Sequence, residues 1–171
     1  SGWVGSRLKK WGFKRLTDVI TLAKFDRALP DVNETNARLR PVADADIPAI
    51  VAVDRAAFTP HWQHSEDTIH RWAAASSCFI VAEVDGSVVG YVEGRLRLPD
   101  AHLNRIALHP AHQGRGIGAS LLRDALRAFW QNEARQVSLN TQADNHFSRR
   151  LYRRFGFESA GNTMTVWERQ L

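Results

Sequence analysis

The sequence is poor in cysteine, in long apolar runs and, beyond its first segment, in lysine. Cys78 is the single cysteine, so no disulfide can form within the chain, which is typical of a reducing compartment. No apolar run approaches the roughly 20 residues of a membrane span, and the N-terminus lacks the apolar core of a signal peptide. We therefore expect a cytoplasmic protein without a membrane partner, in which Cys78 is a buried strand residue.

Lysine is confined to residues 1–24, and this segment accounts for the whole formal net charge of +5. The remaining residues balance acidic side chains against arginines. Because the excess charge lies at one end instead of spreading over a folded surface, we expect no nucleic-acid partner. The change of composition near residue 25 indicates a boundary.

Residues 8–24 and 152–168 align without gaps. Each segment has a basic pair, an aromatic residue, Gly-Phe, a polar turn and an alternating strand. Chance similarity of two helix-to-strand segments is one explanation. The other is that residues 1–29 are the end of an upstream related unit, which a chain that begins without methionine would fit. Residues 30–36 would then be a linker and residues 37–171 the main domain.

The main domain has the pattern of a mixed α/β unit. We expect a strand at 37–42, a helix capped by Asp44 and ending at Phe58, a helix at 69–75 behind Ser65, and a hairpin of 79–84 and 88–96. A strand ending at Leu108, a helix from Ile117, a strand at 136–141, a helix capped by Asp144 or Asn145, and two short strands at 156–157 and 164–167 follow. One strand–helix–strand crossover among hairpins predicts a mixed, mostly antiparallel sheet.

A glycine-rich stretch, His109 to Ala119, connects an apolar strand to an apolar helix. Its glycines permit positive φ and close backbone approach, and the start of the helix presents unpaired N–H groups and the positive end of its dipole. The stretch therefore predicts an anion site.

Other types of glycine loop fit less well. A nucleotide P-loop requires Gly-Lys-Ser/Thr, whereas this loop ends Gly118-Ala119-Ser120. A dinucleotide site needs an acidic residue after the next strand, where Asn140 stands, which disfavours that interpretation. His109 and His112 have no second ligand pair at metal spacing, so we expect no metal.

Two motifs together resemble the GNAT superfamily of acyl-CoA-dependent N-acetyltransferases. They are Gln113-Gly-Arg-Gly-Ile-Gly-Ala119 behind Ile106-Ala-Leu-His-Pro110, and Asp144-Asn-His-Phe-Ser-Arg-Arg-Leu-Tyr-Arg-Arg-Phe-Gly-Phe157. The resemblance runs from about Ala37 to the end and is nearest to the ribosomal-protein N-terminal acetyltransferases; residues 1–29 resemble the end of a second such domain. It implies an α/β (α+β) GNAT-like fold and acetyl transfer from acetyl-CoA to a primary amine of a protein N-terminus, a lysine or a small molecule.

The resemblance also implies the site. Tyr152 matches the tyrosine that protonates the leaving thiolate, a role compatible with packing beside Leu151 and Phe155. The loop amides would hold the pyrophosphate of CoA, the preceding strand would pair with its pantetheine arm, and two asparagines would lie near that arm. The implied cofactor-binding residues are Ile106, Ala107, Leu108, Gln113, Gly114, Arg115, Gly116, Ile117, Gly118, Ala119, Asn140, Asn145 and Tyr152.

The general base is left open. Relatives often have a glutamate where this chain has Asn104 or Asn140, and neither amide accepts a proton at neutral pH. Glu93 and His102 are the remaining catalytic candidates, beside a relayed water; each also suits a solvated or salt-bridged role. Because the glutamates are missing, a CoA-binding regulatory or scaffold domain without turnover is the alternative function. For the assembly we expect either a homodimer or an upstream GNAT-like domain.

Overall fold

The structure, a computed structural model, describes residues 2–169. Residues 1, 170 and 171, which the expected domain ranges include, lie outside the described residues. One sheet of seven strands in the order β2-β3-β4-β5-β6-β1-β7 organises the chain. Its neighbours are antiparallel except for β5 and β6, which are parallel, so the predicted mixed, mostly antiparallel sheet is confirmed.

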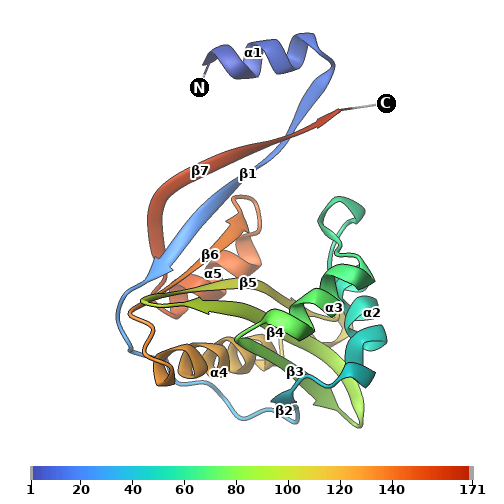
Figure 1. The fold of residues 1–171 in the computed structure, drawn as a ribbon, viewed down its shortest axis with the longest axis vertical. Helices are drawn as coiled ribbons and strands as arrows, with labels where there is room; N and C mark the ends of the chain where they lie inside the picture. Colours follow the sequence, from blue (N-terminus) through green and yellow to red (C-terminus); the bar gives the residue numbers. More distant parts are fainter. Residues whose placement is uncertain (1, 170–171) are drawn as a thin grey trace.

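The elements follow one another along the chain as α1 (Gly2–Lys10), β1 (Phe13–Lys24), β2 (Arg38–Pro41), η1 (Asp44–Asp46), α2 (Ile47–Ala57), η2 (Pro60–Trp62), α3 (Glu66–Ala75), β3 (Cys78–Val84), β4 (Ser87–Arg97), β5 (Asp100–Leu108), η3 (Pro110–His112), α4 (Ile117–Gln131), β6 (Gln136–Gln142), α5 (His146–Arg154) and β7 (Glu158–Arg169). Helix α4 packs on one face of the sheet, and α2 with α3 lies against strands β4 and β5 on the other side (Figure 1).

The two apolar clusters correspond to these two layers. The apolar residues of helix α4 are buried in the first cluster: Ile117, Leu121, Leu122, Ala125, Phe129 and Trp130. Helices α2 and α3 bury Ile50 and Ile69 against Tyr91 of β4 in the second cluster. Cys78 is buried in β3 as predicted, and burial raises the pKa of its thiol to about 12, so it stays protonated at neutral pH.

The predicted cap of α2 is wrong. Asp44 opens the 3₁₀ helix η1 instead, and α2 begins at Ile47. The carboxylate of Asp46 accepts the Ala43 N–H at 2.8 Å and pairs with the Arg40 guanidinium at 2.6 Å. These two contacts hold the chain in a tight turn before the helix starts. The predicted cap of α3 is correct, because Ser65 Oγ accepts the Thr68 N–H.

The predicted last pair of strands is also wrong, because β7 is one strand of 12 residues. It pairs antiparallel with β1 along most of its length, with a register irregularity where Gly161 adopts φ +80°. The described end of the chain forms no hairpin of its own, because β7 pairs with β1 instead of with a second short strand.

The N-terminal segment forms a helix and a strand, as expected for residues 8–25. Strand β1 lies inside the sheet, between β6 and β7. Helix α1 sits beyond the sheet, at the far end of the long β1–β7 pair (Figure 1). No helix within the described residues is long and apolar enough to cross a membrane.

Candidate active site

The glycine stretch forms a tight connection from β5 to α4. Its first turn is closed locally, because His109 Nδ1 accepts the Ala111 N–H and the Gln113 N–H donates to the Pro110 carbonyl. Gly114 and Gly116 then adopt φ +76° and +82°, a region that side-chain-bearing residues rarely enter. Gly116 is the N-cap of α4 and has no side chain to satisfy the first helical N–H groups. These amides are left to bind an anion, with the helix dipole favouring negative charge.

A cavity of about 400 Å³, which we call the loop cavity, lies against this turn. Predicted cofactor residues that line it are Ile106, Ala107, Leu108, Gln113, Gly114, Gly116, Gly118, Ala119 and Asn145. Arg115 is exposed and Ile117 is buried in the core, and neither lines this cavity. A role for Ile117 in binding is therefore restricted to its backbone. Arg154 of α5 also lines the cavity and adds positive charge there.

Strands β5 and β6 separate next to this cavity. They pair only from Asp100–Gln136 to Leu103–Leu139, whereas β1 pairs with the other edge of β6 from Val137 to Gln142. Across β5, the register with β4 shifts between Leu103 and Arg105, so Asn104 is the extra residue of a β-bulge. Beyond Leu103, the β5 edge on the β6 side therefore has no strand partner within the described residues.

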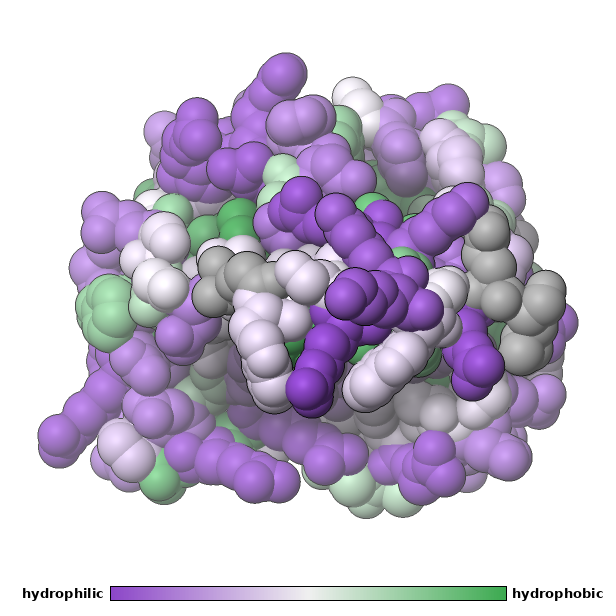
Figure 2. Space-filling view, turned by 90° about the horizontal axis from the view of Figure 1, so that it is seen from above, coloured by the Kyte–Doolittle hydropathy of each residue, from purple (hydrophilic) through white to green (hydrophobic). Residues whose placement is uncertain are grey.

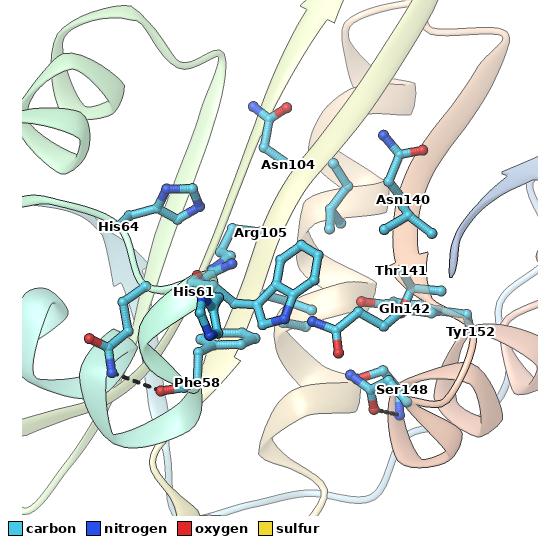
Figure 3. Close-up of a pocket in the computed structure, with 16 residues that line it drawn as sticks. Phe58, His61, His64, Asn104, Arg105, Asn140, Thr141, Gln142, Ser148 and Tyr152 are labelled. Carbon is cyan, nitrogen blue, oxygen red and sulfur yellow. Dashed lines mark hydrogen bonds between the residues drawn. The ribbon is translucent and has the colours of Figure 1, made fainter. Parts of the chain in front are cut away.

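A second cavity of about 440 Å³, the middle cavity, occupies this gap. It shares Phe58, Ile106, Asn145 and Ser148 with the loop cavity, so the two adjoin. Figure 3 shows Asn104 and Asn140 on the two separated strands, Tyr152 on the α5 side, and Phe58, His61 and His64 on the opposite side. The predicted cofactor residues Asn140 and Tyr152 belong to this middle cavity.

Tyr152 has the properties of a neutral proton donor. It is 4% exposed on α5, and its ring meets the Phe157 ring edge-on at 5.8 Å between centroids. Burial raises the pKa of its phenol well above the ordinary value, and the nearby Arg105 charge offsets only part of that rise. The phenol is therefore protonated at neutral pH. No described residue hydrogen-bonds its hydroxyl, which is free to donate into the cavity.

Neither predicted candidate for the base lines the middle cavity. Glu93 is fully buried, with Oε2 accepting from Asn104 Nδ2 at 2.8 Å and Oε1 accepting from the Ser76 hydroxyl. Burial raises its pKa, against the opposing effect of these two hydrogen bonds. His102 lies within hydrogen-bond distance of Ser138 Oγ, 2.8 Å from Nδ1, and burial lowers its pKa. Glu93 thus fixes Asn104 at the bulge, and His102 lies in a neighbouring space.

That space is a third cavity of about 720 Å³, the outer cavity. It lies on the side of β5 away from the glycine turn and shares His64 and Asn104 with the middle cavity. The loop, middle and outer cavities therefore follow β5 from its C-terminal end towards its N-terminal end.

Sequence reasoning missed His64, the titratable residue that lines both the middle and the outer cavity. Its ring lies edge-on to Trp72 at 4.6 Å between centroids. Burial and the Arg105 charge lower its pKa, so the imidazole is neutral at neutral pH. A neutral imidazole is able to accept a proton.

The Asp54 network was also missed. The buried Asp54 carboxylate accepts from Arg105 Nε at 2.9 Å, from Tyr91 Oη at 2.6 Å and from the His64 N–H at 2.8 Å. It holds α2, β4, β5 and the segment leading to α3 together beside the middle cavity. The signal in the sequence is an acidic residue on the apolar face of α2, seven residues after Ile47 and four after Ile50.

Strand β1 contributes to the same site. Val19 lines the middle cavity, and Thr21 Oγ1 donates to Asn140 Oδ1 at 2.9 Å. From the other side, His61 Nε2 lies 3.1 Å from Glu168 Oε1 of β7. The N-terminal segment is therefore part of the wall of the site. Within residues 2–169, no cluster of three or more His, Cys, Asp or Glu side chains is arranged to hold a metal ion.

Comparison with known proteins gives a family and a fold. A model of the "Acetyltransferase (GNAT) family" matches residues 47–157. The chain is 28% identical over 130 residues to a protein of Bacillus subtilis named putative ribosomal protein bS18-alanine N-acetyltransferase, covering 75% of this chain and 85% of that one. It is 31% identical over 121 residues to an uncharacterized N-acetyltransferase of Methanocaldococcus jannaschii, covering 70% of this chain and 76% of that one.

Two solved structures share the fold along nearly the whole chain. A GCN5-related N-acetyltransferase from Sphaerobacter thermophilus superposes with a TM-score of 0.77 at 18% identity, over 98% of this chain and 56% of that one. A tandem GNAT protein from the clavulanic acid biosynthesis pathway superposes with a TM-score of 0.68 at 16% identity, over 98% of this chain and 58% of that one. This chain thus spans just over half the length of these two proteins.

Proposed function

Since the chain belongs to the GNAT family of acetyltransferases, we propose which of its residues carry out each step of acetyl transfer. The protein is an acetyl-CoA-dependent N-acetyltransferase, and its acceptor is a primary amine. Acetyl-CoA supplies the acetyl group as a thioester with a thiol leaving group.

The loop cavity suits the pyrophosphate and pantetheine of CoA. Gly114, Gly116 and Gly118 line it, so any side chain at these positions would occupy space that a ligand needs. The unpaired amides at the start of α4 bind the phosphate oxygens, and the exposed Arg115 supplies charge nearby. Ile106 to Leu108, at the edge of the separated strands, offers backbone groups to the pantetheine amides.

The middle cavity is then the place of reaction, and the position of Tyr152 is the observation that carries this assignment. Its phenol is protonated, lacks a partner among the described residues and lines the cavity that adjoins the loop cavity. Tyr152 Oη gives its proton to the leaving sulfur. The unpaired edge of β5 beyond Leu103 offers N–H groups to the carbonyl oxygen as it gains negative charge.

His64 is the general base in this proposal. It faces the middle cavity from the side opposite α5, and its neutral imidazole takes the proton that the amine loses on attack (Figure 3). Glu93 acts as a positioning residue, because its hydrogen bond fixes the Asn104 amide. His102, in the outer cavity, is nearer to the path of the acceptor than to the sulfur.

Thiol release from acetyl-CoA, measured against a panel of primary amines, tests this function. The proposal expects amine-dependent release with a stoichiometric N-acetyl product identified by mass spectrometry. Tight CoA binding without turnover on any amine would favour the alternative of a regulatory or scaffold domain.

We also propose that α1 and β1 are the end of an upstream GNAT-like unit. The aligned repeats have the same local geometry, since each consists of a helix, a glycine at φ +81° (Gly12) or +82° (Gly156), and a long strand. The repeat alignment places Val19 on Thr163 and Ile20 on Met164. In the sheet Val19 pairs with Met164 and Ile20 with Thr163, so the two pairs exchange under the repeat. The β1–β7 pair therefore has a local twofold axis.

This symmetry indicates which surface the proposed upstream unit would cover. Trp11 of the first repeat is 63% exposed, whereas its counterpart Phe155 is 1% exposed against the core. Figure 2 looks onto the α1 end and shows pale and green residues among the hydrophilic ones. Just as β1 pairs with β6, the equivalent part of β7, residues 163–168, would pair with the β6-like strand of an upstream unit. The long solved structures that cover 98% of this chain support this arrangement over a homodimer. A cytoplasmic location stays a prediction from the single cysteine.

A further inference from the structure

The floor of the outer cavity is formed by three neighbouring strands. Arg95 of β4 pairs with His102 of β5, which pairs with Ser138 of β6, and these three residues form one row across the sheet. The next row outward is Arg97, Asp100 and Gln136. His64 and Trp72 line the same cavity above these rows. The space is therefore built from regular strands and does not depend on a loop.

The floor of the outer cavity carries two arginines. Neither Arg95 nor Arg97 takes part in any ion pair there, and Arg95 Nε is buried without a hydrogen-bond partner. A buried guanidinium N–H without an acceptor is costly, so an acceptor atom is expected to reach it. Asp100 is the acidic residue of the lining, and it lies at the outer row opposite Arg97. The position beside His102 is therefore left with the Arg95 charge.

Glu93 lies near enough to Arg95 for the arginine charge to lower the Glu93 pKa, but the two side chains form no ion pair. Its two carboxylate oxygens are taken by Ser76 and Asn104, and no described hydrogen bond or ion pair joins it to Arg95. The middle cavity has no acidic lining residue at all among those described, and it includes Arg105 and two histidines. An acceptor with several positive charges would therefore meet few acidic side chains along the middle and outer cavities. An acceptor with a negatively charged group would meet Arg95 in the outer cavity.

We propose that the outer cavity binds a carboxylate of the acceptor, which Arg95 holds with help from Arg97 and His102. This inference rests on acetyl transfer in the middle cavity and names the acceptor class as a primary amine that carries a carboxylate. The two cavities share Asn104 and His64, so one molecule spans them. Asn104 and His102 are two residues apart on β5, which corresponds to about 7 Å along the strand. The amine and the carboxylate are separated by roughly that length.

A matched pair of small amines provides the test. 6-Aminohexanoate places a carboxylate about this far from its amine, and hexylamine has the same chain without it. The wild-type kcat/KM for 6-aminohexanoate should exceed that for hexylamine by roughly tenfold, the effect of one charge-assisted hydrogen bond. Arg95→Gln should reduce this ratio to about one, and Arg97→Gln should reduce it in part.

Arg127→Gln is the matched control, since Arg127 is exposed on α4 and lines none of the three cavities. The ratio should be the same as in wild type. A wild-type ratio near one, or a high ratio that survives in both Arg95→Gln and Arg97→Gln, would overturn the proposal.

Calorimetric titration with hexanoate separates this proposal from the assignment of catalysis. Hexanoate should bind the wild type and the Arg127→Gln variant, and its affinity should fall about tenfold in Arg95→Gln. If neither amine is turned over while this pattern holds, the assignment of the reaction fails and the carboxylate site stands. Equal affinity of wild type and Arg95→Gln for hexanoate would contradict the site even where turnover occurs.

Discussion

Among single residues, the site depends on a buried phenol and a partly buried imidazole whose protonation is set by their surroundings. Tyr152 is kept protonated, and His64 is kept neutral. The two residues that we propose as acid and base lie on opposite sides of the middle cavity (Figure 3). Two groups whose pKa values are pushed apart in this way suit opposite proton transfers at neutral pH.

The pH profile tests the role of His64. Because its pKa is lowered below 6.5, the base form is lost only as the pH falls through that lower value. With kcat/KM calculated on the free-amine concentration, wild type should show an acid limb centred below 6.5 and a plateau above it. His64→Gln should remove this limb and lower kcat roughly 100-fold.

His70→Gln provides the control, since His70 is exposed on α3 and lines none of the cavities. An acid limb that persists in His64→Gln but disappears in Glu93→Gln or His102→Gln would assign the base to that residue instead.

Asp54 is a residue whose loss should affect stability. Asp54→Ala leaves the Arg105 guanidinium, 10% exposed, without its partner, so the free energy of unfolding should fall by about 3 kcal/mol. Asp124→Ala removes a carboxylate that is 30% exposed in its pair with Arg123 and should cost less than about 1 kcal/mol. Urea unfolding followed by circular dichroism measures both; similar losses in the two variants would contradict the account of the network.

At the scale of elements, the glycine turn tests whether the loop cavity holds CoA. Gly116→Val puts a β-branched residue at φ +82° and a Cβ 3.4 Å from Thr35, inside the turn that lines the loop cavity. CoA affinity, measured by calorimetry, should fall at least roughly tenfold. Gly86→Val introduces similar strain at φ +78° in the β3–β4 turn, away from the site. Its CoA affinity should be unchanged, and an equal loss in both variants would exclude a specific role of the glycine turn.

The elements themselves were largely predictable, because their signals are local. The periodicity of α4, the Asp85-Gly86 turn and the Ser65 cap depend on residues close in sequence. The predicted cap of α2 was wrong because Asp46 forms an ion pair with Arg40 of β2, and this contact between two elements is not visible in the local sequence. The two short final strands failed because β1, more than a hundred residues earlier, provides their pairing partner.

The site residues likewise fall into those indicated by local motifs and those that depend on contacts between distant segments. The glycine turn and Tyr152 lie in continuous motifs, so the sequence predicts them as site residues, and they line the loop and middle cavities. His64 was missed because its importance arises from the meeting of three segments at one gap in the sheet. The sequence indicates Asn104 as a position where relatives often have a glutamate. It does not show that Asn104 lies in a bulge, since a bulge depends on the register between β4 and β5.

In the whole molecule, the sheet includes a strand from each of the two aligned segments, β1 and β7. The wall of the middle cavity includes β1, so the segment that we propose belongs to an upstream unit also shapes this active site. Such an arrangement would couple the stability of the two units, because each would supply a strand to the other.

Hydrogen exchange tests this arrangement. In a chain extended at its N-terminus by the proposed upstream unit, the amides of residues 163–168 should exchange at least roughly tenfold more slowly than in the 171-residue chain, and Trp11 should become less accessible to a quencher. The amides of β3, in the middle of the sheet, are the internal reference. Equal exchange of residues 163–168 in both chains would contradict the shared sheet. Protection that appears in the shorter chain with rising concentration would indicate a homodimer.

We propose that acetyl transfer takes place in the middle cavity with Tyr152 as the acid. Steady-state thiol release by Tyr152→Phe, measured together with its CoA affinity, tests it most directly. The ring of phenylalanine keeps the packing on Phe157 and removes the proton donor. We expect kcat to fall roughly 100-fold with CoA affinity within about twofold of wild type. A kcat equal to that of wild type would exclude Tyr152 as the acid.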